Sequence, residues 1–463
     1  MGGGVMSSST ARRSDRSAPS GSSAPSDSSV RLIRTLTVTV FLQWMGSTAI
    51  VPMLPPYIRH LGGSDALAGV VMAAFFAAGV ISQYPIGRLA DRVGRRPVLI
   101  AGLVTYAAAS MSFLLPITAD VAVLLRALQG VGAGAATVAA LAMIAGSVSL
   151  ERRGRAFASI YGGELAGMAV GPLIGSIVGI RYMGAMFLAS GLLALAACLP
   201  ALRIKEAGGP VLRPVEPDPS PASSREESDA GRSSGLARVR IGRSMVGALV
   251  CAGALGLANG VYDICWTLLL LARGASGLEI GISWTLFAVP FVLVARPSGW
   301  LADHLDRRVL VLAGLGVSAV LCASYPFIHN VPVLILLGAS EALGFAAAMP
   351  AVQSLLTQGS SPSEVGRIQG MFGTSQTACT AVAAAFAGAA FAVTAWLPFV
   401  TVASLVGVAL VVVTFIWLPV PGRVRHPTGD SESTPEPEPV PLAPTGPAAQ
   451  LSGEAAGVRV EVQ

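Results

Sequence analysis

Three acidic residues lie inside long apolar stretches of the sequence: Glu164, Asp263 and Glu341. An ionised carboxylate that faces lipid costs about 2.5–3.5 kcal/mol or more, so each acid is expected to face the interior of a helical bundle. A desolvated carboxyl group there can take up and release a proton. We rank Asp263 first as the proton carrier because it lies deepest in its stretch, with Glu164 or Glu341 in reserve. A protonated, hydrogen-bonded core acid is the alternative for each.

A basic residue, Arg126, also lies inside an apolar stretch, far from the arginines of the loops. A buried guanidinium is costly unless it faces a cavity or a partner charge, so Arg126 is the candidate to sense the proton on the acids; simple burial beside a partner is the alternative. Polar and aromatic residues at similar depth are candidates to line a substrate cavity, although residues of these types more often serve packing. They are Gln43, Trp44, Gln129, Tyr262 and Trp266.

Apolar segments must position these residues. The chain is 53% hydrophobic and only 12% charged, which argues against a water-soluble globular protein. Each segment has the length of a helix that crosses a ~30 Å hydrocarbon core. The twelve predicted spans are 35–57, 66–87, 97–117, 120–147, 156–179, 183–203, 245–271, 278–301, 309–328, 331–357, 366–391 and 396–418.

Polar segments flank and separate the predicted spans. We expect disordered cytoplasmic tails at 1–34 and 419–463, six-helix bundles at 35–204 and 244–418, and a cytoplasmic linker at 205–243. Of the basic residues, 26 fall on the side that holds both termini and three fall on the opposite side. Because segments rich in Lys and Arg stay in the cytoplasm, both termini are predicted to be cytoplasmic.

The two predicted bundles are copies of one another. At an offset of 212 residues, ten of the twenty positions from Tyr84 to Leu103 are identical to those from Arg296 to Leu315. Parallel six-helix repeats imply a pseudo-two-fold axis along the membrane normal, a cavity between the halves and a rocking motion that alternates access to it. A receptor or scaffold has no equal need of such halves, so the repeat favours a transporter.

The loop after the second predicted span carries glycines and charges at fixed spacing. Its residues are Gly87, Asp91, Arg92, Gly94, Arg95 and Arg96. Glycine permits close helix approach, and an aspartate with its arginines can clamp two helices together. The loop matches the pattern G-x-L-a-D-r-x-G-r-[kr] and so resembles the major facilitator superfamily, in which it gates the transport path. The second copy keeps Gly299, Asp303 and Arg307. His304 stands in place of Arg92, and Asp306 stands in place of Gly94.

Two more patterns resemble motifs of the same superfamily. The run that starts at Arg126 is similar to R-x-x-q-G-x-g, which the family links to proton coupling. The second pattern consists of Gly167, Gly171, Pro172 and Gly175. It resembles g-x-x-x-G-P-x-x-G-G, found mainly in the drug and proton antiporters of the family, with Ser176 in place of the last glycine. Glycines four residues apart also allow close helix packing on their own. The resemblance favours antiport over symport.

The resemblance implies an all-α polytopic membrane protein with 12 transmembrane helices in two six-helix repeats around a central cavity. It is strongest to the 12-helix drug:proton antiporter group. Many drug antiporters carry an acid in the first span, whereas this chain has Gln43 and Trp44 there. That departure moves the expected proton site to another helix.

Enzymes and ATP-driven pumps are disfavoured because the sequence has no H-E-x-x-H pattern and no P-loop. We therefore expect a secondary transporter, not an enzyme, with no cofactor and no metal, which exports small amphipathic compounds or drugs in exchange for protons. The alternatives are a proton-linked importer or facilitator of a metabolite and, less favoured, a non-transporting membrane sensor. The expected partners are a small-molecule substrate, protons and the lipid bilayer, with no nucleic acid. The protein is expected to be a monomer in the plasma membrane.

Overall fold

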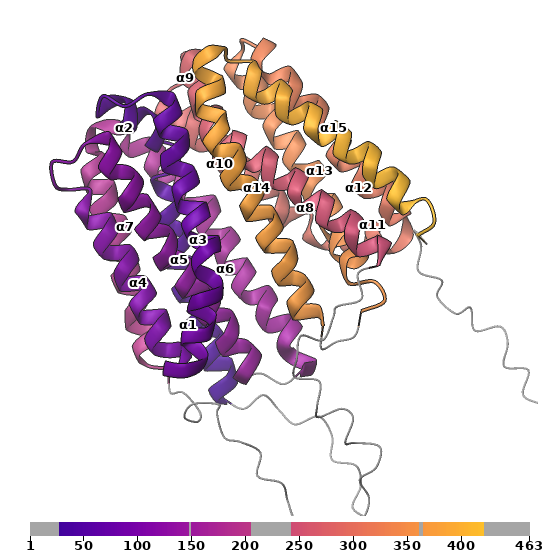
Figure 1. The fold of residues 1–463 in the computed structure, drawn as a ribbon, viewed down its shortest axis with the longest axis horizontal. Coiled ribbons are helices and arrows are strands. Elements are labelled where there is room, and N and C mark those ends of the chain that lie inside the picture. Colours follow the sequence, from indigo (N-terminus) through magenta and orange to yellow (C-terminus); the bar gives the residue numbers. More distant parts are fainter. Residues whose placement is uncertain (1–26, 148–149, 205–241, 361–363, 421–463) are drawn as a thin grey trace, which may run out of the picture. The chain divides into compact units, whose positions relative to one another are not determined.

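The computed structural model describes residues 27–147, 150–204, 242–360 and 364–420, and it is all helical within these ranges (Figure 1). The first half contains α1 (Asp27–Ala49), α2 (Leu54–His60), α3 (Asp65–Val93), α4 (Arg95–Ser112), α5 (Ala119–Ser147), α6 (Leu150–Val178), η1 (Ile180–Tyr182) and α7 (Met183–Leu202). The second half contains α8 (Arg243–Val261), η2 (Tyr262–Trp266), α9 (Thr267–Ala272), α10 (Gly277–Leu293), α11 (Ala295–His304), α12 (Arg307–Ser324), η3 (Tyr325–Phe327), α13 (Val331–Thr357), α14 (Val365–Val393) and α15 (Leu397–Trp417).

Every predicted span coincides with helix in the described part of the chain. Nine of the helices described there, or ten when the bent pair of α1 and α2 counts as one span, are long and apolar enough to cross a membrane. The two remaining spans are α4 and α10. The 18 residues of α4 include Arg95 and Arg96, which lower its hydropathy, and α10 is a shorter apolar helix that breaks at Val294 before α11. The structure is therefore consistent with a twelve-span membrane protein.

The first span differs from the prediction at both ends. α1 begins at Asp27, so residues 27–34, expected in a disordered tail, are helical in the structure. After Ala49 the span bends by 45° into α2. Pro52 and Pro55 account for the break because proline has no N–H to continue the helical hydrogen bonds.

Close backbone packing joins α1 to α6 along the glycine motif. A Cβ atom built on Gly167 would lie 2.8 Å from the Met45 nitrogen and the Phe41 carbonyl oxygen, and one built on Gly171 would lie 2.5 Å from the Met45 carbonyl oxygen. Any side chain larger than hydrogen would force the helices apart. Pro172 lies inside α6 directly after Gly171.

The two halves meet at the ends of the helices remote from the tails. There a Cβ atom on Gly69 of α3 would contact the backbone of Gly388 of α14 at 3.1 Å. On α10, Thr285 donates a hydrogen bond of 2.9 Å to the Ala169 carbonyl oxygen of α6. α2 also packs on α9 at this end (Figure 1). Helix-to-helix contact between the halves is thus concentrated at one end of the molecule.

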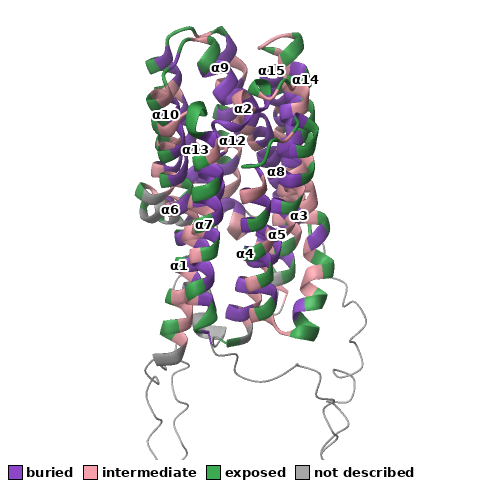
Figure 2. Ribbon diagram, turned by 90° about the vertical axis from the view of Figure 1, so that its left-hand side faces the viewer, coloured by how far each residue is buried: buried purple, intermediate pink, exposed green. Residues whose placement is uncertain are grey.

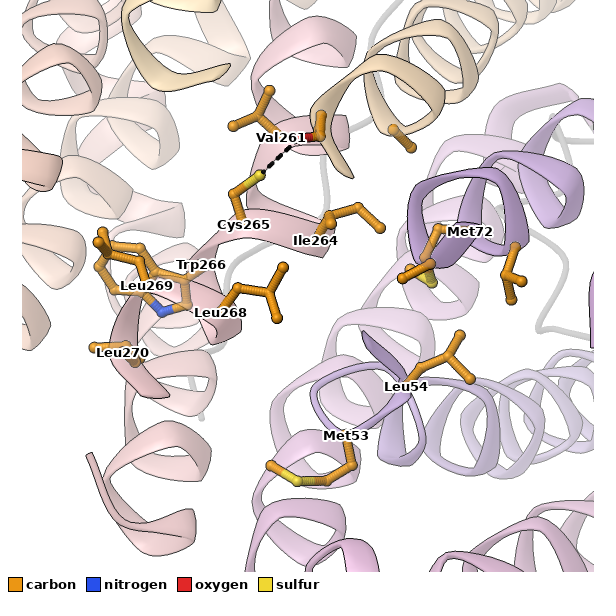
Figure 3. Close-up of a cluster of buried hydrophobic side chains, with 14 of the residues drawn as sticks. Met53, Leu54, Met72, Val261, Ile264, Cys265, Trp266, Leu268, Leu269 and Leu270 are labelled. Carbon is orange, nitrogen blue, oxygen red and sulfur yellow. Dashed lines mark hydrogen bonds between the residues drawn. The ribbon is translucent and has the colours of Figure 1, made fainter. Parts of the chain in front are cut away.

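A cluster of buried apolar side chains fills the same end. Met53, Leu54 and Met72 from the first half face Ile264 and Leu268 from the second half (Figure 3). Elsewhere buried residues line the contacts between neighbouring helices, and exposed apolar residues follow the outer faces (Figure 2). Exposed apolar side chains suit a surface solvated by lipid.

The predicted division into two six-helix bundles stays a prediction. Helices of both halves pack together into one compact unit, and the sequence repeat alone marks the division. The linker at 205–243 lies almost entirely outside the described residues, as do residues 1–26 and 421–463 of the two predicted tails.

Candidate functional site

Arg126 is buried in the first third of α5, and only 1% of its surface is exposed. Its Nη1 donates a hydrogen bond of 2.9 Å to Gln129 Oε1, and Gln129 Nε2 donates one of 2.7 Å to Ser110 Oγ on α4. The guanidinium carbon lies 4.5 Å from the ring centroid of Phe75, and Nη2 approaches Met72 Sδ at 3.5 Å. Cation–π and amide contacts thus hold the charge in place without a directly bonded anion.

Asp263, in the second half of the chain, carries the charge opposite to that of Arg126. The two charges lie within electrostatic range of each other, although no hydrogen bond joins them. In the part of the chain that the structure describes, the partly buried Asp263 carboxylate accepts no hydrogen bond, and Arg126 Nε is buried without a partner. Opposite charges that act on each other without a hydrogen bond form a pair that a movement of the halves can tighten or separate.

A π-helical turn, η2, carries Asp263. It covers Tyr262–Trp266 and interrupts an otherwise continuous helix between α8 and α9. A π-turn adds one residue to the helical circuit and redirects the side chains around it, and such turns are frequent at functional sites. The amphipathic pattern of the sequence does not reveal this turn, because a π-turn and an α-turn accept the same apolar residues.

Glu341 on α13 binds a set of hydroxyl groups that we call the hydroxyl cluster: Tyr262, Ser318 and Tyr325. Tyr262 Oη donates to the two carboxylate oxygens at 2.6 Å and 2.8 Å, Tyr325 Oη donates at 2.5 Å, and Ser318 Oγ also donates. Only 1% of Glu341 is exposed. Three donors around a carboxylate satisfy most of its lone pairs, so the structure gives this acid a fixed position.

Aromatic rings surround the hydroxyl cluster. Trp266 donates from Nε1 to Ser283 Oγ at 3.0 Å, and its ring reaches within 3.3 Å of a Cβ atom built on Gly338. The ring centroid of Trp266 lies 5.1 Å from that of Tyr325 and 6.2 Å from that of Tyr262. The structure therefore brings five predicted site residues into one neighbourhood with Asp263: Arg126, Gln129, Tyr262, Trp266 and Glu341.

Glu164 stands outside this neighbourhood. It lies partly buried on α6, and the one charge interaction that involves it is with Tyr161, a turn earlier on the same helix. Within the described residues no hydrogen bond or charge contact joins Glu164 to Asp263, Arg126 or Glu341. Its role in proton transfer stays a prediction.

Both cavity candidates in α1 are packed inside the protein, and Trp44 lies against α6. Gln43 is buried, and Trp44 contributes its Cβ atom to the contact at Gly167. Trp44 Nε1 is buried and has no hydrogen-bond partner in the described part of the chain. An unused donor at this position is available to a polar group of a ligand.

The first gating loop ties α4 to its neighbours through arginines. Arg95 Nη1 donates to the Ala142 carbonyl oxygen at 2.6 Å, and Arg96 Nη2 donates to the Leu202 carbonyl oxygen at 2.5 Å. Gly94, with a φ of 99°, separates α3 from α4. Gly87 faces Val138 at 3.8 Å from its built Cβ atom.

Asp91 and Arg92, predicted in this loop, lie instead in the last turn of α3, because the helix continues to Val93, and both are exposed. Within the described residues Asp91 has no ion pair or hydrogen bond, so the arginines of the loop bind carbonyl oxygens at helix ends and leave the carboxylate free. The structure shows no charge clamp at Asp91 among the residues that it describes, and the expected clamp stays a prediction.

The second predicted gating loop is held by different contacts, which include an ion pair. Arg307 Nε donates to the Ala302 carbonyl oxygen at 3.1 Å, and Arg308 forms an ion pair of 2.7 Å with Asp306. Hydrogen bonding from Arg308 lowers the pKa of the Asp306 carboxyl below its ordinary value. The side chains of the predicted gating residues Gly299 and Asp303 lie outside the described residues.

Sequence reasoning missed several partners of these groups: Ser110, Met72 and Phe75 around Arg126, and Ser318 and Tyr325 around Glu341. Each is an ordinary residue of an apolar segment. Only the packing of α3 and α4 with α5, and of α12 and the adjoining η3 with α13, brings it to a charge. The repeat offers one signal, because an offset of 212 residues places Gln129 and Glu341 at the same position of the two halves.

Relatives of this chain are known membrane transport proteins. The class E tetracycline resistance protein of Escherichia coli is 29% identical over 87% of this chain and 98% of its own length. The multidrug resistance protein MdtG of Enterobacter lignolyticus is 27% identical over 74% of this chain and 82% of its own length.

Solved structures share the fold. A bacterial homologue of the human lysosomal transporter Spinster aligns with a TM-score of 0.65 and 15% identity over 85% of this chain and 97% of that one. The human organic anion transporter MFSD10 aligns with a TM-score of 0.59 and 17% identity over 84% of this chain and 100% of that one. The sequence profile of the Major Facilitator Superfamily matches residues 36–271 and 248–454. With its helical fold and apolar spans, the chain is therefore a multi-pass membrane transporter of the Major Facilitator Superfamily and not an enzyme.

Proposed function

We propose that this transporter exports small amphipathic compounds or drugs from the cell in exchange for protons. The tetracycline and multidrug resistance proteins among its relatives support the export of drugs. Without an ATP-binding P-loop, the energy comes from an ion gradient, and protons are the ion that a lone buried carboxylate can carry.

The observation that carries this proposal is the unbonded pair of Arg126 and Asp263 on opposite halves of the chain. Protonation of Asp263 removes its attraction for Arg126. A cationic or polar group of a substrate that reaches Asp263 competes with the proton for the same carboxylate. One site that holds either a proton or a substrate is what antiport requires.

The helix contacts favour a conformation open on the side of the tails. Contacts between the halves lie at the remote ends of α3, α6, α10 and α14. By contrast, Cβ atoms built on Gly162, Gly370 and Gly373, nearer the tails, would meet nothing within 4 Å. With both termini in the cytoplasm of a plasma-membrane protein, as the charges of the loops favour, this is an inward-facing state.

In the proposed cycle the inward-facing transporter releases its proton from Asp263 and loads substrate near the aromatic rings of Tyr262 and Trp266. The gating loop at Asp91 then closes the cytoplasmic side while the remote contacts open. A proton from outside displaces the substrate from Asp263. Glu164 is the reserve carrier in this scheme, and the monomer contains all of its parts.

The test uses purified protein in liposomes that contain a pH-sensitive dye, under an imposed proton gradient. Cationic and neutral amphiphiles, including tetracycline, are added one at a time. We expect some compounds to dissipate the gradient and others to leave it unchanged, in contrast to protein-free liposomes. A folded protein that responds to none of them would contradict proton-coupled drug export.

The same liposomes separate export from its rival. Reversing the sign of the gradient distinguishes antiport, in which substrate moves against the proton, from proton-linked import, in which both move together. Removing residues 421–463 tests the sensor alternative, because that deletion should spare transport.

A further inference from the structure

Two adjacent residues of η2 reach partners in different halves of the protein. Tyr262 donates to Glu341 of the second half at 2.6 Å and 2.8 Å. Asp263 interacts electrostatically with Arg126 of the first half. The next residues of the turn also diverge: Ile264 packs toward Met72, and Cys265 Sγ donates to the Ala387 carbonyl oxygen at 3.6 Å (Figure 3). A single turn of helix therefore links Glu341 of the second half to the buried Arg126 of the first half.

The Glu341 carboxylate differs from Asp263 in its surroundings. It accepts hydrogen bonds from Tyr262, Ser318 and Tyr325, and the Cys322 thiol also lies within electrostatic range. A carboxylate with three donors is held firmly, whereas a proton carrier must exchange its proton with a path to water. The geometry suits an anchor better than a carrier.

We propose that Glu341 is a positioning residue that acts through Tyr262: it holds η2 in its π-helical form and thereby sets where Asp263 stands relative to Arg126. The inference rests on the proposed function of the Arg126 and Asp263 pair. It goes beyond that function because it separates the residue that exchanges the proton from the residue that tunes the exchange.

The physical argument concerns the extra residue in the π-turn. A π-turn is less stable than α-helix and persists where a side-chain contact stabilises it. Among the described hydrogen bonds of η2, the bond from the Tyr262 hydroxyl is the one that reaches the Glu341 carboxylate. When this bond is lost, the turn can relax toward α-helix, and the Asp263 side chain rotates away from its present direction. The bond can bias the turn by no more than its own free energy.

The experiment follows Asp263 directly with dicyclohexylcarbodiimide, which modifies neutral carboxyl groups in apolar surroundings, and reads the adduct by peptide mass spectrometry. In the full-length protein in liposomes at pH 7, we expect labelling of Asp263 to rise about two- to tenfold in Tyr262→Phe, the range set by one hydrogen bond. The rise follows because separation from Arg126 no longer favours the charged carboxylate.

Tyr325→Phe is the matched control. It removes a hydroxyl donor to the same carboxylate oxygen, since Tyr325 and Tyr262 both bond Glu341 Oε2, but Tyr325 lies in η3 and not in η2. We expect labelling of Asp263 to stay within about twofold of the parent protein in this variant. Equal labelling in both variants, or no change in either, would overturn the proposal.

Glu341→Gln separates this proposal from the proposed function. As a positioning residue, Glu341 can be replaced by an amide with partial retention of proton-driven transport and a displaced pH profile, together with increased labelling at Asp263. Loss of driven transport with unchanged Asp263 labelling would make Glu341 the carrier and end the positioning role. If Asp263→Asn retains driven transport, the proposed function itself fails, whatever the labelling shows.

Discussion

The two halves of this transporter place different chemistry at equivalent positions. The repeat offset of 212 residues pairs Arg126 with Gly338 and Gln129 with Glu341. In the first half a buried cation rests on an amide and on the Phe75 ring. In the second half the space beside Gly338 is filled by the Trp266 ring, and the acid beside it binds hydroxyls.

This difference shows how a duplicated fold acquires direction. Two identical halves would hold charges of the same sign, which could not attract each other across the interface. Arg126 in one half and Asp263 in the other have opposite charges, and in the proposed cycle this charge pair opens and closes as the halves rock. The predictions below test that asymmetry, beginning with the residue that links the halves.

Replacing Asp263 with Asn should have the largest effect. The amide keeps the shape of the side chain but cannot carry a proton, so proton-driven efflux should fall to the background of protein-free liposomes. Downhill exchange of substrate should remain, since it needs no proton. Both are measured with a transported fluorescent amphiphile. Asp120→Asn is the control, because Asp120 is an exposed acid in the first turn of α5. Intact driven efflux in Asp263→Asn would refute the asymmetry.

Arg126→Lys keeps the charge of the first half but removes its planar geometry. Lysine cannot reproduce both the amide bond to Gln129 and the face-on contact with Phe75. Loss of charged hydrogen bonding costs about 1.5–3 kcal/mol, which corresponds to roughly a 10- to 100-fold fall in rate. Proton-driven efflux should decrease by that factor while the melting temperature in detergent stays near that of the parent. An unchanged rate would show that charge alone matters.

The sequence predicts the positions of the helices better than the contacts of the buried charges. Apolar length and the positive loops suffice to place the helices, since crossing a bilayer imposes both. Arg126 and the acids stand out because charges in apolar segments are rare. The partners of those charges do not stand out: Ser318 and Tyr325 become meaningful only when α12 packs on α13. The π-turn at Asp263 also escapes prediction, because its stability comes from a contact with Glu341, 79 residues away in sequence.

Gly167→Ala tests the asymmetry of packing. At the contact of α1 with α6 in the first half, the glycines lie on α6. At the equivalent contact of α8 with α14 in the second half, Cys379 of α14 takes the place of Gly167, and the glycine, Gly253, lies on α8. A methyl group at 167 would meet the backbone of α1 at 2.8 Å. Overpacking of this kind costs about 1–3 kcal/mol. The melting temperature should fall in Gly167→Ala and stay nearly constant in Cys379→Ala, and equal losses would mean that the two interfaces pack alike.

The smallest effect is expected where the two gating loops differ, at Gly94 and its equivalent Asp306. Gly94 reaches a φ of 99°, whereas Asp306 has a φ of −66° and caps α12 through its bond to the Arg308 nitrogen.

Hydrogen bonding from Arg308 lowers the pKa of Asp306, so the carboxylate stabilises the folded protein above the unfolded pKa of about 4. That contribution is lost as pH falls through the lower folded pKa. Because the pair is partly exposed, Asp306→Asn should lower stability at pH 7 by no more than about 1 kcal/mol, and the difference from the parent should shrink below pH 4. Melting temperatures measured from pH 3 to pH 7 provide the check, and a difference that grows toward low pH would contradict the role of this ion pair.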